Sequence, residues 1–212
     1  MANLITIGRL ALLFVAIAMI YSRSYPLAAL SILLIAVVFA SDGLDGFVAR
    51  RRQSTSDFGA VLDIAGDRVV ENALWIVFAQ RGLIGVWAPL FVMTRGFLVD
   101  AMRSVTFAVG KSAFGDNTMM LTPLSRFLTA SRFMRAFYGA AKGLGFLFLA
   151  GLIASALPDA AGGWLAGLYR HGTFRFVGWF MVYSALGLTI VRGVPVLYDA
   201  MYYVRGSGED AG

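Results

Sequence analysis

Four aspartates lie close together near the beginning of this 212-residue sequence, at Asp42, Asp45, Asp63 and Asp67. The first two are three residues apart and the last two are four apart, so on a helix the members of each pair share one face. The polar segment RRRQSTSD predicts a turn, and an antiparallel hairpin bent at residues 53–55 brings both pairs to about the same depth. Four carboxylates in a medium of low dielectric constant would repel one another and partly protonate unless cations bind them. The pattern therefore predicts a site for two hard divalent ions with oxygen ligands.

A structural interpretation of the same aspartates is that some are helix caps or ion-pair partners of the neighbouring cluster Arg50, Arg51 and Arg52. For one isolated aspartate that interpretation would be the better one. Four aspartates at paired helical spacing beside apolar helices favour the metal site, because acidic residues are rare within membrane segments.

The composition indicates a membrane protein. Hydrophobic residues make up 59% of the chain and charged residues 14%, with a mean hydropathy of +0.75. Soluble domains carry about 25% charged residues. We predict an all-α, polytopic membrane protein that forms a single domain over residues 1–212, with six transmembrane helices and a short interfacial N-terminal helix.

The six predicted apolar runs leave most of the cationic residues on one face of the membrane. The runs cover residues 10–21, 26–50, 58–78, 86–109, 137–157 and 174–190. The favoured topology puts both termini and the loops 50–57 and 110–135 on the face rich in Lys and Arg, which the positive-inside rule makes cytoplasmic. A lateral helix is expected within residues 110–135. The loops of the opposite face contain four cationic residues: Arg23, Arg81, Arg170 and Arg175.

The net charge and the numbers of cysteine and histidine residues limit the possible functions further. The net charge is +6, but the arginines flank apolar runs, which favours membrane topology and an anionic substrate over nucleic acid. The absence of cysteine excludes disulfides and thiolate metal sites, and we expect no cleavable signal peptide. The single histidine, His171, receives no role. Arg68 and Glu71 are three residues apart and are expected to pair on one helix.

The aspartates belong to a longer pattern, D-x2-D-G-x2-A-R-x8-G-x3-D-x3-D. This pattern resembles the motif of the CDP-alcohol phosphotransferase family, and the match has no departure. It covers about an eighth of the chain, and the helix pattern of the remainder also resembles this family. The matching residues are Asp42, Asp45, Gly46, Ala49, Arg50, Gly59, Asp63 and Asp67.

The resemblance implies a metal-dependent transfer reaction. Asp42 and Asp63 would touch both ions, Asp45 one and Asp67 the other, with Mg²⁺ as the usual metal and Mn²⁺ as the alternative. Asp67 would also be the general base that takes a proton from an acceptor hydroxyl, which attacks the lipid-side phosphorus of a CDP-linked lipid and expels CMP. The resemblance further implies phospholipid biosynthesis in the cell inner membrane and a homodimer. The positive-inside rule puts the aspartate motif near the cytoplasmic face, so the active site is expected to face the cytoplasm.

The resemblance also implies contacts to CDP. Asn3, Thr6 and Arg9 follow one another at helical spacing, and the family has a similar N-x2-T-x2-R segment that favours CDP contact for Asn3 and Thr6. An interfacial N-terminus capped by Asn3 explains that spacing equally well. Capping is likewise the alternative for Ser56. The residues expected to bind CDP are Gly46, Ala49, Arg50, Ser56, Gly59, Asn3 and Thr6.

The cationic residues of the second half suggest a phosphorylated acceptor. The expected acceptor-phosphate ligands are Arg95, Arg103, Arg132, Arg135 and Lys142. A pair with Asp100 or with an aspartate of the metal site is the alternative for the arginines of the fourth run. Interfacial anchoring and lipid headgroup binding are the alternative for all five. Glycerol 3-phosphate is the first choice of acceptor, since the chain resembles bacterial phosphatidylglycerophosphate synthases in length, and inositol 1-phosphate is the second. A non-enzymatic channel or carrier for divalent cations is the rival from another class.

Overall fold

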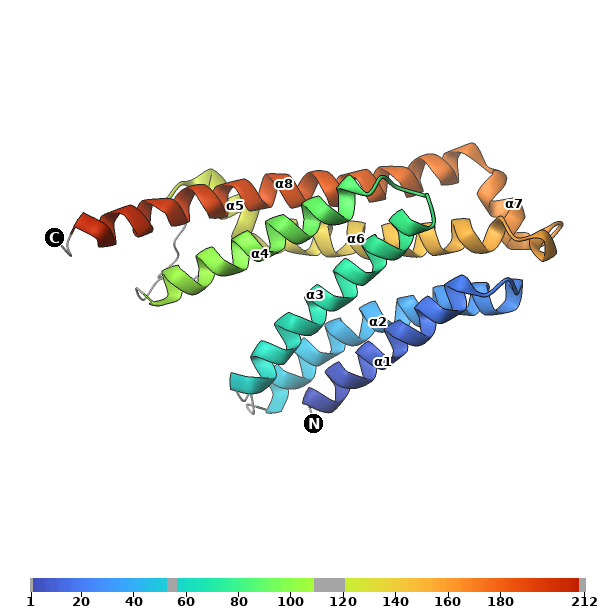
Figure 1. The fold of residues 1–212 in the computed structure, drawn as a ribbon, viewed down its shortest axis with the longest axis horizontal. Helices are drawn as coiled ribbons and strands as arrows, with labels where there is room; N and C mark the ends of the chain where they lie inside the picture. The colour runs from blue at the N-terminus through green and yellow to red at the C-terminus, as the bar shows by residue number, and fades with distance from the viewer. Residues whose placement is uncertain (1, 53–56, 109–120, 210–212) are drawn as a thin grey trace. The chain divides into compact units, whose positions relative to one another are not determined.

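The computed structural model describes residues 2–52, 57–108 and 121–209, with the side chains of residues 2–3, 42–52, 57–58, 60, 106–108 and 202–209 excluded. The described residues fold into helices and short connections, so the all-α prediction is confirmed. Figure 1 shows the helices in chain order. The α-helices are α1 (Ala2–Tyr21), α2 (Tyr25–Arg52), α3 (Asp57–Gln80), α4 (Trp87–Ala108), α5 (Pro123–Ala130), α6 (Arg132–Ser155), α7 (Trp164–Arg170) and α8 (Gly172–Glu209), and one 3₁₀ helix, η1, covers Pro158–Ala160.

The chain divides into two compact units. The first contains residues 1–89 and 143–182, and the second contains residues 90–142 and 183–212. Both α6 and α8 contribute one part to each unit.

In the first unit, α1 packs against both α2 and α3, and Figure 1 shows α1 lying beside α2. An aromatic cluster around Phe146 of α6 joins α2 and α3 to this core. The ring of Phe146 lies 4.8 Å from Trp75, 5.7 Å from Phe39 and 5.8 Å from Phe78, measured between ring centres. Such contacts hold α3, and with it the second aspartate pair, in a fixed position.

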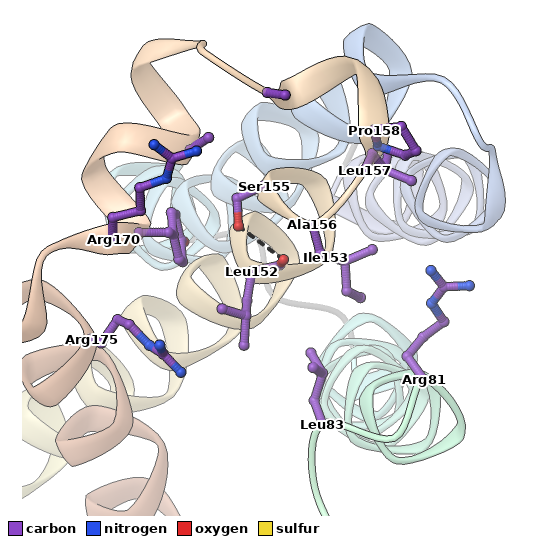
Figure 2. Close-up of a pocket in the computed structure, with 13 residues that line it drawn as sticks. Arg81, Leu83, Leu152, Ile153, Ser155, Ala156, Leu157, Pro158, Arg170 and Arg175 are labelled. Carbon is purple, nitrogen blue, oxygen red and sulfur yellow. Dashed lines mark hydrogen bonds between the residues drawn. The ribbon is translucent and has the colours of Figure 1, made fainter.

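The end of the first unit near α7 is held by a second aromatic group. The Tyr169 ring stacks on Phe148 at 5.4 Å between ring centres, and the Tyr169 hydroxyl donates a 2.9 Å hydrogen bond to the Phe148 carbonyl oxygen. Burial raises the pKa of Tyr169, so the hydroxyl stays protonated and donates. A cavity of about 500 Å³ adjoins this group, and Figure 2 shows residues that line it.

In the second unit, α5 begins with a capping box. The Thr122 hydroxyl accepts from the Ser125 backbone N–H, the Ser125 hydroxyl accepts from the Thr122 N–H, and Pro123 occupies the first helical turn. The buried carboxylate of Asp199 on α8 accepts a 3.1 Å hydrogen bond from the Leu121 N–H, which ties α8 to the segment before α5.

Several predicted helix bounds need correction. Residues 2–21 form one 20-residue helix, so the expected short interfacial helix before residue 10 is not a separate element. The last helix runs over 38 residues, where the sequence predicted residues 174–190. The other four predicted runs correspond to α2, α3, α4 and α6 with shifts of a few residues, and α5 falls within the segment expected to contain a lateral helix.

The helices are those of a membrane-embedded protein. Within the described residues, three stretches have the length and apolar composition needed to cross a bilayer: Leu4–Tyr21, Arg132–Ser155 and Gly172–Met201. Tyr25–Ser41 is a shorter apolar stretch in α2. A total of six transmembrane helices remains a prediction.

Candidate active site

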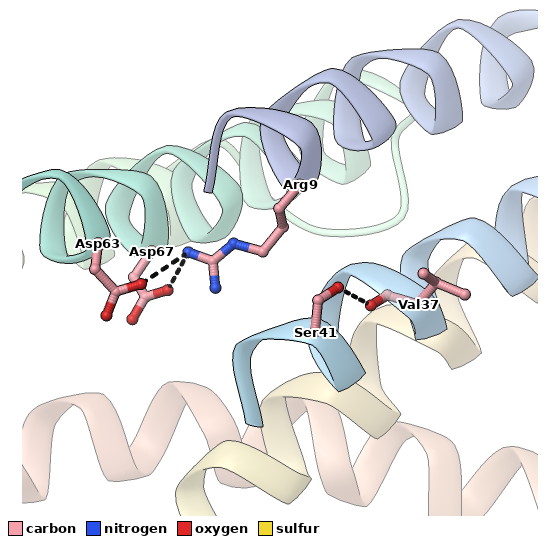
Figure 3. Close-up of polar contacts among 5 residues, drawn as sticks. All are labelled: Arg9, Val37, Ser41, Asp63 and Asp67. Carbon is pink, nitrogen blue, oxygen red and sulfur yellow. Dashed lines mark hydrogen bonds and ion pairs between the residues drawn. The ribbon is translucent and has the colours of Figure 1, made fainter. Parts of the chain in front are cut away.

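Asp63 and Asp67 project from the same face of α3 toward one arginine of α1, as Figure 3 shows. The Arg9 Nη2 atom donates to the Asp67 Oδ1 atom at 2.6 Å and lies 3.8 Å from the Asp63 Oδ1 atom. The prediction that these aspartates share a helix face is therefore confirmed. One guanidinium group joins both carboxylates to the N-terminal helix.

The charges of this cluster differ sharply in exposure. The Arg9 side chain is 2% exposed, whereas those of Asp63 and Asp67 are 47% and 50% exposed. A buried guanidinium needs an anionic partner, because desolvation would otherwise be costly. The carboxylates supply that partner and remain open to a ligand on their other side. Each carboxylate has two oxygens, so Asp67 can bind Arg9 through one and a cation or substrate through the other.

Gly66 permits the close approach of α1 to α3 at this point. A Cβ atom at Gly66 would lie 2.8 Å from the Thr6 Cγ2 atom and 3.2 Å from the Arg9 Nη2 atom. Thr6 itself is 3% exposed. The missing side chain of one glycine thus lets the Thr6 methyl group and the Arg9 guanidinium lie against α3.

The first aspartate pair lies on α2, but Asp42 and Asp45 fall among the residues whose side chains are outside the description. The meeting of all four carboxylates therefore stays a prediction. Among the described residues, no group of three or more acidic, histidine or cysteine side chains is close enough to hold a metal ion. The described half of the motif, two half-exposed carboxylates on one helix face, has the donor chemistry that hard divalent ions prefer.

The predicted CDP ligands are described only in part. Thr6 lies against α3 and Gly59 lies in the first turn of α3, so both belong to the helix pair that carries Asp63 and Asp67. The contact of both residues with CDP stays a prediction. The remaining predicted CDP ligands lie outside the described side chains: Asn3, Gly46, Ala49, Arg50 and Ser56.

The second unit contains a cationic cluster around Tyr138. The Lys142 Nζ atom lies 4.9 Å from the centre of the Tyr138 ring, and the Arg192 Cζ atom lies 5.0 Å from it. Arg192 also donates a 3.1 Å hydrogen bond to the Thr129 carbonyl oxygen, and the Tyr138 hydroxyl is 3.2 Å from the Thr189 hydroxyl. These contacts bring cations from α6 and α8 to one aromatic ring.

The other four predicted acceptor ligands have different surroundings from those of Lys142. Arg103 lies 3.9 Å from Asp100, which agrees with the ion-pair interpretation of that residue. Arg95 packs against Gly193, where a Cβ atom would approach the Arg95 Nε atom to 2.7 Å. Arg132 and Arg135 are exposed on the first turn of α6. The predicted structural pair on α3 is confirmed, with 3.6 Å between Arg68 and Glu71.

Two residues of these clusters were missed in the sequence. Arg9 was grouped with Asn3 and Thr6 but received no partner, because its partner lies 58 residues further on. Arg192 lies just beyond the predicted run 174–190, although Arg192 and Asp199 are seven apart in an apolar segment and so share a helix face. A cationic residue within an apolar helix is by itself a signal of function.

The helical fold and the acidic, arginine-bound face of α3 define a membrane-embedded helical protein with a site suited to charged ligands. The sequence profile of one family, CDP-alcohol phosphatidyltransferase, matches residues 1–191. Since the match covers most of the chain, this protein belongs to the CDP-alcohol phosphatidyltransferase family.

Individual relatives agree with this assignment. The chain is 29% identical over 90 residues to the CDP-diacylglycerol–glycerol-3-phosphate 3-phosphatidyltransferase of Bacillus subtilis (strain 168), covering 42% of this chain and 47% of that protein. It is 29% identical over 101 residues to the protein of the same name from Rickettsia bellii (strain RML369-C), covering 48% and 56%. The chain thus spans about half the length of these two relatives. It is 35% identical over 83 residues to CDP-diacylglycerol–inositol 3-phosphatidyltransferase 1 of Arabidopsis thaliana, covering 37% and 34%.

Proposed function

We propose that this protein transfers a phosphatidyl group from CDP-diacylglycerol to an alcohol acceptor, with glycerol 3-phosphate as the acceptor and CMP as the leaving group. The observation that carries this proposal is the position of Asp63 and Asp67 on one face of α3, beside Arg9, in a chain of this family. Two bacterial relatives are named for transfer to glycerol 3-phosphate, which supports that acceptor.

The reaction forms one phosphorus–oxygen bond and breaks another. The acceptor hydroxyl oxygen attacks the lipid-side phosphorus of the diphosphate, and the bond from that phosphorus to CMP breaks, so CMP leaves with the electron pair. Asp67 receives the hydroxyl proton as general base. Arg9 positions Asp67, because the 2.6 Å hydrogen bond fixes one oxygen of the carboxylate on a buried guanidinium.

Asp42, Asp45, Asp63 and Asp67 would hold two divalent ions, Mg²⁺ with Mn²⁺ as the alternative, which neutralise the diphosphate charge and activate CMP as a leaving group. Support for this part comes from the two described carboxylates, whose half-exposed oxygens suit hard cations. CDP would contact Asn3, Thr6, Gly46, Ala49, Arg50, Ser56 and Gly59. For Thr6 and Gly59, support comes from their places on the helices that carry Arg9 and Asp67.

The phosphate of the acceptor would bind near Tyr138. Lys142 and Arg192 both lie within about 5 Å of that ring, so a dianionic phosphate beside the ring would meet two cations. Arg95, Arg103, Arg132 and Arg135 would have secondary roles in attracting the anion.

Inositol 1-phosphate is the second acceptor to consider. The Arabidopsis relative is named for transfer to inositol, and a phosphorylated inositol would use the same cationic cluster. We further propose six transmembrane helices, a homodimer, and a position in the cell inner membrane with the active site facing the cytoplasm, as the distribution of Lys and Arg favours.

The test measures CMP release by purified protein with CDP-diacylglycerol, Mg²⁺ and either glycerol 3-phosphate, inositol 1-phosphate, inositol or serine. We expect release with glycerol 3-phosphate, and release only with another acceptor would reassign the substrate. Asp67→Asn is expected to abolish release while leaving the fold intact, with a lower melting temperature because the buried Arg9 guanidinium loses one anionic partner. Asp159→Asn, which changes an exposed carboxylate in η1, serves as the matched control. Turnover by Asp67→Asn at the wild-type rate would remove Asp67 from the role of base. Divalent-ion flux without any CMP release would favour the carrier.

A further inference from the structure

The cavity at the α7 end of the first unit is bordered by three arginines from different elements (Figure 2). Arg81 directly follows α3, Arg170 is the last residue of α7, and Arg175 lies in the first turn of α8. In the view of Figure 2, Arg170 and Arg175 lie on one side of Leu152, and Arg81 lies on the other. Three arginines from different elements thus line one space of about 500 Å³, and the Arg81 guanidinium also lies over the Tyr21 ring, 5.7 Å from its centre.

The arrangement leaves an excess of positive charge around the cavity. None of the described residues that line it is acidic, and none of the ion pairs found between described residues involves these three arginines. The α8 macrodipole also disfavours a cation in the first turn, where Arg175 lies. An anion bound in the cavity would offset both effects, and guanidinium groups are well suited to phosphate oxygens.

Position and charge together make the cluster unusual. The sequence gives the loops at the end opposite the cytoplasmic face only four cationic residues, and three of them line this cavity. The fourth, Arg23, does not line it. Simple interfacial anchoring would not require cations from three elements to gather at one space.

The wall of the cavity is apolar and includes a tyrosine whose position is fixed by a hydrogen bond. Leu83, Leu152 and Ile153 contribute aliphatic side chains. Tyr169 is fixed by its hydrogen bond to the Phe148 carbonyl oxygen, and the absence of a side chain at Gly151 makes room for the Tyr169 hydroxyl. A ligand that suits this site therefore combines an anionic group with hydrocarbon.

The cavity is separate from the acidic site of α3. Arg81 comes fourteen residues after Asp67, which corresponds to about 21 Å along a helical axis. The neighbouring α6 and α8 include stretches long and apolar enough to span a bilayer, so the cavity lies where such helices begin or end. Phospholipid phosphates lie at the same level of a membrane.

We propose that this cavity binds the phosphate group of an anionic phospholipid, with Arg81, Arg170 and Arg175 as ligands and the acyl chains lying along the apolar surface of α6 and α8. The inference does not depend on the proposed transferase activity, because it concerns a different end of the first unit. The proposal is therefore tested by measuring lipid binding and not turnover.

The experiment titrates the purified full-length chain with phosphatidylglycerol or phosphatidylcholine in detergent and counts bound lipid by native mass spectrometry. The variants are Arg170→Gln/Arg175→Gln and, from the other side of the cavity, Arg81→Gln. Arg23→Gln is the matched control, since Arg23 is an exposed arginine in the same unit that does not line the cavity. Inorganic phosphate is added in a parallel titration as a competitor.

We expect the wild type to prefer phosphatidylglycerol, and each removed cavity arginine to weaken its binding by about fivefold, as is typical for a basic residue near anionic lipid. Arg23→Gln should bind as the wild type does. Equal loss in Arg23→Gln, unchanged binding in the cavity variants, or equal retention of phosphatidylcholine would overturn the proposal. Displacement of the lipid by equimolar inorganic phosphate would assign the cavity to a free anion and overturn the lipid assignment. If the double variant fails to fold, Arg81→Gln alone decides the outcome.

Discussion

Gly66→Ala is the most direct perturbation of the contact between α1 and α3. The new Cβ atom would lie 2.8 Å from the Thr6 Cγ2 atom, whereas carbon atoms in contact are normally about 3.5 Å apart. The shortfall is about 0.7 Å. Since Thr6 is buried, we expect α1 to move away from α3 by about this distance.

That movement has a predictable effect on the pair of Arg9 with Asp67. If α1 shifts as a rigid helix, the 2.6 Å hydrogen bond lengthens to about 3.3 Å, beyond the usual range for such bonds. Overpacking costs about 1–3 kcal/mol, and the better helix propensity of alanine offsets up to about 1 kcal/mol of that. If Asp67 is the general base, as we propose, a displacement of this size in its contact with Arg9 is expected to lower turnover by roughly 10- to 100-fold.

The assay compares Gly66→Ala with Gly8→Ala, which adds the same methyl group on α1 at a position with no atom within 4 Å of the new Cβ. Melting temperature and CMP release are measured for both. Gly8→Ala should match or slightly exceed wild-type stability and retain turnover. If Gly66→Ala behaves like Gly8→Ala in both measurements, the close approach at Gly66 has no role. If it loses stability but keeps full turnover, Arg9 does not position Asp67 as the proposed general base.

Three further outcomes follow from the same structure. Removal of divalent ions by EDTA should abolish CMP release and lower the melting temperature. Adding Mg²⁺ at 100 times its dissociation constant should restore about 2.7 kcal/mol of stability. An unchanged melting temperature after EDTA treatment would argue against a metal site in the folded protein. Arg192→Gln should raise the KM for glycerol 3-phosphate by about tenfold with little change for CDP-diacylglycerol, because the proposed charge-assisted contact to phosphate is lost. Arg126→Gln changes an exposed arginine on α5 and is the control. A proportional rise in both KM values would indicate a structural role for Arg192. Gly151→Ala should destabilise the protein by about 1–3 kcal/mol because the new methyl group would overlap the Tyr169 hydroxyl. Gly167→Ala has open space at its Cβ and should leave the stability unchanged. Equal melting temperatures for the two variants would contradict the packing described at α7.

Local periodicity predicted most of the fold. The apolar runs identified α2, α3, α4 and α6 to within a few residues, because long apolar segments in a membrane protein have few alternatives to the helix. The four-residue spacing of Asp63 and Asp67 was enough to predict their shared face. Both are properties of a single helix, so the sequence of that helix is enough to predict them.

The errors occur where a polar residue inside a helix is satisfied by a distant partner. The predicted apolar run begins only at residue 10, after Arg9, and its shortness favoured an interfacial start. The charge of Arg9 is met by α3, and the helix runs unbroken from Ala2. The predicted run 174–190 likewise stops before Arg192 and Asp199, although both are buried and hydrogen-bonded to backbone groups of other elements. Such partners are fixed by tertiary packing, which the spacing of residues in one chain does not reveal.

The pairing of Arg9 with α3 has a consequence for biogenesis. The first helix enters the membrane with a cation whose counter-ion is encoded 58 residues downstream. At a synthesis rate of 5–20 residues per second, roughly 3 to 12 s pass before the ribosome has added that carboxylate. During this interval the nascent N-terminal segment must keep its guanidinium near lipid headgroups or water, and it can settle fully only when the third helix arrives. Maturation of the acidic centre is therefore coupled to the arrival of α3 beside α1.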